Sequence, residues 1–242
     1  MNVSVDELGG GSAGGAARGG PGAGACARSV AAWEIASVVS SGLIAEWAVL
    51  ALVGFSKLWL AVPVALALAL MIASHRARGE TLRQLGWRFD NLWESLRVLL
   101  PLMAAGAALL ALWGWLWFGG RFRVGGWRAG WWGLGFPLWG VAWGLVQQYV
   151  LQAFINRRAQ EVLGAGWRSV LLVALLFALL HLPNPWLTLA TFCGGLLWAW
   201  AYQRAPNLFA LALSHAVMTW VLVSTVPAAA LHGLRVGYKY FG

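Results

Sequence analysis

The chain has 242 residues, of which 60% are hydrophobic and only 10% are charged, and its mean hydropathy is +0.70. Soluble domains carry about 25% charged residues, so the composition excludes a soluble protein and indicates an all-α, polytopic integral membrane bundle. The formal net charge of +9 comes from Arg and Lys between apolar runs. That pattern orients membrane proteins and contacts lipid headgroups, so we expect membrane lipid, and no nucleic acid, as a partner. The two cysteines, Cys26 and Cys193, make no disulfide framework.

Residues 1–28 are rich in Gly, Ala and Ser and poor in large apolar side chains. Such a segment buries too little apolar area to offset its ordering entropy, so we predict a disordered tail before one membrane domain over 29–242. Seven apolar runs follow, each judged against the roughly 20 residues of a membrane crossing. They predict seven or eight transmembrane helices, with a motif-bearing core over about 132–226. The runs cover about 30–55, 58–73, 98–118, 132–155, 170–182, 186–202 and 208–226.

Between the second and third runs, residues 79–97 place apolar side chains at helical spacing among charged ones. This pattern predicts a helix lying in the headgroup plane; a plain linker helix is the alternative. His75 and His232 flank apolar runs, and we expect both to be solvated. If the N-terminus lies inside, the segments on the inside carry more Arg and Lys residues than the segments on the outside. We therefore expect that orientation, in the inner membrane of a bacterium.

Polar side chains interrupt three of the apolar runs. A polar group in the hydrocarbon core is costly, so it usually faces the bundle interior and marks a functional site. At a rise of 1.5 Å per residue, Gln148, His181 and His215 lie roughly 12–18 Å from the inner ends of their helices. Three clusters at one depth predict a shared polar pocket. The clusters are Gln147, Gln148 and Gln152, then His181, then His215 and Thr219.

These residues resemble the motifs of the CPBP intramembrane proteases, a family of CAAX proteases and bacteriocin-processing enzymes also called the Abi group. That family carries EExxxR on one helix, FxxxH on the next and HxxxN further on. Phe177 and His181 match the second motif, and the Leu-Pro-Asn-Pro that follows, with Asn184, is similar to family members. His215 matches the third motif, with Thr219 where Asn is common. Gln147, Gln148 and Gln152 replace both glutamates and the arginine of the first motif.

The resemblance implies a helical membrane bundle and an ancestral endopeptidase activity on prenylated or membrane-spanning peptides. It implies that the first glutamate activates a water and that the histidines assist and stabilise the oxyanion. It also places Gln152, Phe177, Asn184 and Thr219 at a substrate pocket. A primary amide has no comparable basicity, so Gln147 cannot take the glutamate's role. Losing both acids and the arginine together, however, leaves no unpaired buried charge, and three glutamines can hydrogen-bond one another.

Several hypotheses remain open from the sequence. The chain cleaves peptides with a relocated acid, for which Glu46 in the first run is the deep candidate, or with His181 alone as general base. Alternatively it is a non-catalytic pseudoprotease or scaffold that binds lipidated or helical peptides. A third hypothesis is a metal site. We expect no cofactor, but a zinc ion remains an alternative. A catalytic zinc generally has three protein ligands, and these would be His181, His215 and Glu46. Two further hypotheses are that the polar groups serve only helix–helix packing and that the chain is a small transporter.

Overall fold

The computed structural model describes residues 21–53, 57–119 and 135–242, and within these ranges it contains helices and loops but no strand. The all-α membrane bundle is therefore confirmed. The helical elements are α1 Pro21–Leu43, η1 Ile44–Val49, α2 Leu50–Val53, α3 Lys57–Ala77, α4 Leu92–Phe118, α5 Gly135–Gln148, η4 Tyr149–Asn156, α6 Arg157–Leu163, α7 Trp167–Leu179, α8 Pro185–Arg204, α9 Leu208–Thr225, η5 His232–Leu234 and η6 Gly237–Tyr240.

Each predicted apolar run corresponds to one helical run. The first is a continuous helix in which η1, a π-helical stretch, joins α1 to α2; the fourth runs from α5 through the π-helical η4 into α6. The end of the first predicted run and the start of the fourth lie outside the described residues. Because α1 begins at Pro21, residues 21–28 are helical and not part of a disordered tail, and residues 1–20 lie outside the described ranges.

Among the described helices, four are long and apolar enough to cross a membrane by themselves. They are Gly24–Val53, Leu58–Ala77, Leu92–Phe118 and Leu208–Thr225. Trp167–Leu179 is also apolar but shorter, which agrees with the short fifth run in the sequence. The side chains that would face lipid are large and apolar, as on Leu52 and Trp117, which are 84% and 71% exposed.

The predicted headgroup-plane helix over 79–97 is wrong for most of its length. Residues 78–91 form turns, and the helix begins only at Leu92. Gly79 and Gly86 have φ angles of +63° and +92°, which interrupt a right-handed helix. The carbonyls of this segment instead bind other elements: Leu85 O accepts from Tyr202 Oη at 3.1 Å and Gly86 O from Leu208 N at 2.9 Å. These bonds tie the segment to the junction between α8 and α9.

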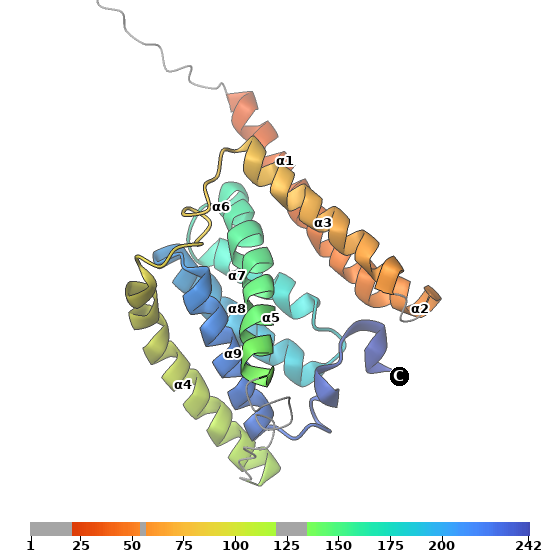
Figure 1. Ribbon diagram of the computed structural model, residues 1–242. Coiled ribbons are helices and arrows are strands. Elements are labelled where there is room, and N and C mark those ends of the chain that lie inside the picture. Colours follow the sequence, from red (N-terminus) through yellow and green to blue (C-terminus); the bar gives the residue numbers. More distant parts are fainter. Residues whose placement is uncertain (1–20, 54–56, 120–134) are drawn as a thin grey trace, which may run out of the picture.

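The bundle has two parts (Figure 1). In the larger part α9 packs against both α4 and α5, and α7 packs against α8. Its core surrounds Phe154, Phe177, Leu208 and Leu211. The smaller part is the α1–α3 hairpin (residues 21–53 and 57–77), whose two long helices lie side by side. The hairpin contacts α6 near the α3–α4 loop and leans away from the larger part toward α2 (Figure 1).

Candidate functional site

The predicted polar clusters meet where α5 packs against α9. Gly144 permits the close approach, because a Cβ there would lie 3.0 Å from Ala212 O and 3.3 Å from His215 Cβ. One turn further on, the fully buried Gln148 reaches α9, with its Nε2 at 3.1 Å from His215 Nδ1. An amide nitrogen only donates, so Nδ1 of neutral His215 accepts and its Nε2 carries the proton. His215 is thereby set as a hydrogen-bond donor toward the rest of the site.

His181 is set the opposite way. Its Nδ1 lies 2.7 Å from the carbonyl of Phe177, one turn earlier. A carbonyl only accepts, so Nδ1 carries the proton and Nε2 of neutral His181 presents a lone pair. The Phe177 ring links the two histidines: its centroid is 4.7 Å from the His181 ring and 6.3 Å from the His215 ring. The structure thus brings His181, Phe177 and His215 together as predicted.

Trp198 of α8 is a member of this site that sequence reasoning missed. Its ring stacks on His215, with centroids 4.6 Å apart and planes 13° apart, and its Nε1 donates to Ser214 Oγ at 3.0 Å. Gly194 leaves room for the indole, because a Cβ there would lie 2.8 Å from Trp198 Cζ3. In a chain with 18 tryptophans nothing in the sequence distinguishes this one.

The three glutamines do not form the mutual network that the sequence suggested. Gln148 bonds His215 on α9, whereas Gln152 Oε1 accepts from Asn156 Nδ2 at 2.8 Å, and Asn156 also donates to Ala199 O on α8. The two side chains therefore have separate partners, although they are only four residues apart along the chain. Three buried amide atoms have no hydrogen-bond partner among the described residues: Gln147 Oε1, Gln148 Oε1 and Gln152 Nε2.

Thr219 and Asn184, which we expected in the pocket, have different structural environments. Thr219 is half-buried on α9, one turn beyond His215. Asn184 is fully buried and structurally engaged: its side chain accepts from Leu187 N to cap α8 and donates to Leu231 O at 2.7 Å and Arg235 O at 3.1 Å. The amide of Asn184 is thereby occupied in holding the C-terminal segment.

Glu46 lies in η1 and is half-buried. Within the described ranges no hydrogen bond or ion pair joins it to His181 or His215; its backbone instead packs against Gly237, and the charged group that acts on its carboxylate is Lys239. Nor do any three His, Cys, Asp or Glu residues in those ranges gather into a group that could hold a metal ion. The structure therefore does not place Glu46 as a replacement acid or as a third zinc ligand.

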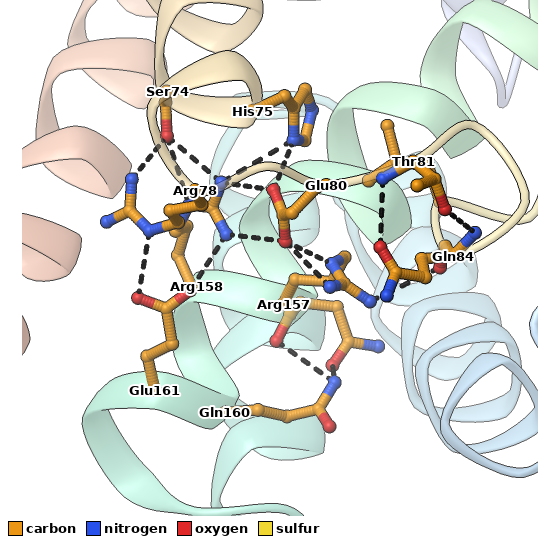
Figure 2. Close-up of polar contacts among 12 residues, drawn as sticks. Ser74, His75, Arg78, Glu80, Thr81, Gln84, Arg157, Arg158, Gln160 and Glu161 are labelled. Carbon is orange, nitrogen blue, oxygen red and sulfur yellow. Dashed lines mark hydrogen bonds and ion pairs between the residues drawn. The ribbon is translucent and has the colours of Figure 1, made fainter. Parts of the chain in front are cut away.

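A second polar cluster, at the hairpin contact, holds most of the paired charge (Figure 2). Arg158 is fully buried, with Nη2 at 2.7 Å from Glu80 Oε2, Nη1 at 2.8 Å from Glu161 Oε1 and Nε at 3.2 Å from Glu34 Oε2. A buried guanidinium is stable only when its charge and its donors are matched. We call this set the Arg158 cluster; its members are Glu34, Ser74, His75, Arg78, Glu80, Arg157, Arg158 and Glu161.

The Arg158 cluster corrects the expectation that His75 is solvated. His75 is only 6% exposed, and its Nδ1 lies 2.6 Å from Glu80 Oε2. Arg157 Nε also reaches Glu80, at 2.7 Å from Oε1. A sequence signal existed: the chain has only eight acidic residues, and three of them are in this cluster, next to arginines expected at the same membrane face.

The Arg158 cluster predicts a specific acid sensitivity. Burial alone would raise the pKa of the Glu80 carboxyl, but hydrogen bonds from His75, Arg158 and Arg157 outweigh burial and hold that pKa well below its usual range. The folded state therefore favours the ionised form, and this contribution to stability is complete above the unfolded pKa of about 4.3 and is lost as the pH falls toward the folded pKa. We expect Glu80→Gln to destabilise the protein at neutral pH, with a penalty that shrinks as the pH falls below about 4.

Thermal unfolding of both proteins in lipid nanodiscs, across that pH range, measures the effect. Glu94→Gln is the control, because Glu94 is exposed in the first turn of α4 and its loss should give a small and constant difference. A Glu80→Gln penalty that stays the same at every pH would contradict the assignment.

A family comparison identifies the fold that holds both clusters. The family model described as type II CAAX prenyl endopeptidase, Rce1-like, matches residues 24–221, which is most of the chain. The chain belongs to this Rce1-like family. Neither a curated protein nor a solved structure matches it. Membership confirms the resemblance to CPBP proteases and, with the apolar helices, an integral membrane location. In this Rce1-like chain, no acidic side chain forms a hydrogen bond or ion pair with His181 or His215 within the described ranges.

Proposed function

We propose that this chain is a non-catalytic member of the Rce1-like family that binds lipid-modified or membrane-embedded peptides. The observation that supports this most strongly is the contact between the Gln148 amide and His215 Nδ1 at 3.1 Å. An amide occupies the place where the family resemblance implies a carboxylate, and an amide cannot accept the proton of an attacking water. Glu46 packs against the C-terminal segment, and among the described residues no carboxylate forms a hydrogen bond or ion pair with either histidine.

Binding is supported by what the site retains. Gln147 Oε1, Gln148 Oε1 and Gln152 Nε2 offer two acceptors and one donor, in a setting where an unsatisfied polar group is costly. A peptide backbone presents matching donors and acceptors. Next to His181, apolar side chains of η1 and α7 line a groove of about 400 Å³, which suits a hydrocarbon chain or an apolar helix. A pseudoprotease keeps polar groups that can bind a peptide but lacks the general base that activates a water, and this site fits that description.

A second candidate is hydrolysis with His181 as general base. The lone pair on His181 Nε2 and the proton on His215 Nε2 would serve as base and oxyanion donor on opposite sides of a carbonyl. In the part of the chain that the structure describes, no carboxylate bonds either ring, so this route lacks the group that stabilises an imidazolium in histidine-based hydrolases. We rank it second for that reason.

The test uses the full-length protein in liposomes with a fluorescent farnesylated peptide and a separate transmembrane peptide. Binding is read by fluorescence anisotropy and cleavage by mass spectrometry. We expect saturable binding of at least one peptide without cleavage, and weaker binding by His181→Ala but not by Leu175→Ala, an exposed residue of α7, the helix that ends just before His181. Cleavage by the wild type that requires His181 would establish the second candidate. Absence of binding to both peptides would overturn the first.

We also propose that the protein lies in a bacterial plasma membrane with its N-terminus inside. The contacts of Arg78 with Glu161 and of Arg157 with Glu80 place the α3–α4 loop and α6 at one end of the bundle. Gly166 N bonds Gln203 Oε1 at that end too. Arg168 and Arg204, which are close to these two residues in the sequence, therefore lie at the same end. Gathering of arginines at one end is the pattern of a cytoplasmic face. Protease protection of an N-terminal tag in inverted membrane vesicles tests this orientation.

A further inference from the structure

The C-terminal residues 236–242, which we call the strap, contact both the first helical run and the α7–α8 turn. On one side, Gly237 N donates to Leu182 O at 2.8 Å, directly after His181. On the other side the strap meets the first helical run: Phe241 contacts the Trp47 ring, with centroids 6.3 Å apart, and Lys239 acts electrostatically on Glu46. The strap therefore joins η1 to the turn between α7 and α8.

The groove beside His181 lies between those same two elements. Its lining is entirely apolar and comes from η1 and its neighbours and from the end of α7: Leu43, Ile44, Trp47, Ala48, Leu179 and Leu182. Trp47 and Leu182 belong to both the groove and the strap contacts. A change in the strap must therefore alter the spacing of the groove walls.

The hairpin is held differently at its two ends. At one end the Arg158 cluster ties α1 and the α3–α4 loop to α6 through ion pairs, and Arg158 also donates to Ser74 of α3. At the other end, near α2, the hairpin diverges from the larger part of the bundle (Figure 1), and the groove lies on that side of it. A rigid element anchored at one end and diverging at the other is the arrangement of a hinged domain.

We propose that the strap is a latch: it holds the η1 end of the α1–α3 hairpin against the α7–α8 turn and thereby sets the width of the groove beside His181. The Arg158 cluster is the fixed end, and release of the strap lets the hairpin swing outward and widen lateral access from the membrane. The inference rests on the proposed function only in taking this groove as the way into the binding site.

Gly237 is the position at which the latch can be released by one substitution. It has a φ of +57°, and a Cβ there would lie 2.6 Å from Glu46 O and 2.9 Å from Glu46 Cβ. Both atoms belong to η1 and cannot move without moving the helix. Gly237→Ala therefore pushes the strap off η1. Gly233→Ala is the matched control, because Gly233 has a φ of +62° in the same segment with nothing within 4 Å of an added Cβ.

The experiment measures the distance between nitroxide labels on Leu52 of α2 and Leu175 of α7, both exposed, by pulsed electron paramagnetic resonance in nanodiscs. The native cysteines, Cys26 and Cys193, are exposed and are first replaced by serine. We expect Gly237→Ala to add a population at longer distance and Gly233→Ala to match the unsubstituted protein. Lys239→Ala and Phe241→Ala weaken the latch without backbone strain, and each should add a smaller long-distance population.

Superposable distance distributions for Gly237→Ala, Lys239→Ala and Phe241→Ala would overturn the latch. So would an equal shift in Gly233→Ala, because the change would then reflect backbone strain and not the contact with Glu46. No peptide is present in the measurement. The latch and the proposed binding function can therefore fail independently.

Discussion

Replacing Arg158 with methionine is expected to lower the free energy of unfolding by about 3–5 kcal/mol, the usual cost of breaking a buried ion pair by removing one partner. Methionine retains the length and apolar stem of the side chain, so the loss comes from charge and not from a cavity. Glu80 and Glu34 would each lose a partner in a setting where their side chains are only 7% and 11% exposed. Thermal or denaturant unfolding in nanodiscs, followed by tryptophan fluorescence, measures the change.

Two comparisons make the Arg158 prediction specific. Arg168→Met removes an exposed arginine near the start of α7 and is expected to change the free energy of unfolding by no more than about 0.5 kcal/mol. Adding Glu80→Gln and Glu34→Gln to Arg158→Met removes the uncompensated charges and is expected to recover part of the loss. If Arg158→Met were as mild as Arg168→Met, the buried pairs would not be what anchors the hairpin.

Restoring the family's first motif is expected to produce the largest functional change. The triple variant Gln147→Glu/Gln148→Glu/Gln152→Arg introduces the two acids together with the arginine, so that one cation accompanies the two carboxylates. A positioned general base contributes about 10²–10⁴-fold to a hydrolytic rate. We expect cleavage of the farnesylated peptide to rise by that factor over the wild-type background, measured by mass spectrometry of the products.

His181→Ala in the restored background is the control, because the family resemblance gives the histidine a part in the chemistry that glutamate alone cannot replace. Circular dichroism and binding of the same peptide establish that the triple variant is folded. A folded triple variant that binds peptide but releases no product would show that the missing acids do not by themselves explain why this chain does not hydrolyse peptides. It would also separate the proposed binding function from the account of why hydrolysis is lost.

The elements of the fold were predictable because apolar length is a local property of the sequence. The apolar runs predicted the long helical runs from α1 to α9 in the described residues, and the short run ending at Leu182 anticipated the short α7. The meeting of His181 with His215 was also predictable, since equal depth follows from counting residues along straight helices. Packing partners were not. Trp198 and Gly144 owe their roles to which helix faces which, and periodicity does not specify that.

The loop over 78–91 shows a second limit of sequence reasoning. Leu82, Leu85 and Phe89 recur at helical spacing, yet only Leu85 is buried, at 3% exposed, while Leu82 and Phe89 are 68% and 69% exposed. Leu85 is inside because the segment folds onto α8 and α9 through its carbonyl groups. His75 and Glu80 were overlooked for the same reason: their burial depends on α6, far along the chain, closing over them.

The π-helical stretch Tyr149–Asn156 has a consequence for how this protein tolerates change. Each residue in an α-helix advances the direction of its side chain by roughly 100°, and each residue in a wider turn advances it by less. This stretch therefore holds about one residue more than an α-helix of the same total rotation would. Deleting one residue within it would restore ordinary pitch and keep Gln148 and Arg158 close to their present orientations. Inserting one would turn one end relative to the other, so that either Gln148 would lose His215 or Arg158 would lose its glutamates. A single deletion is thus expected to be tolerated better here than a single insertion.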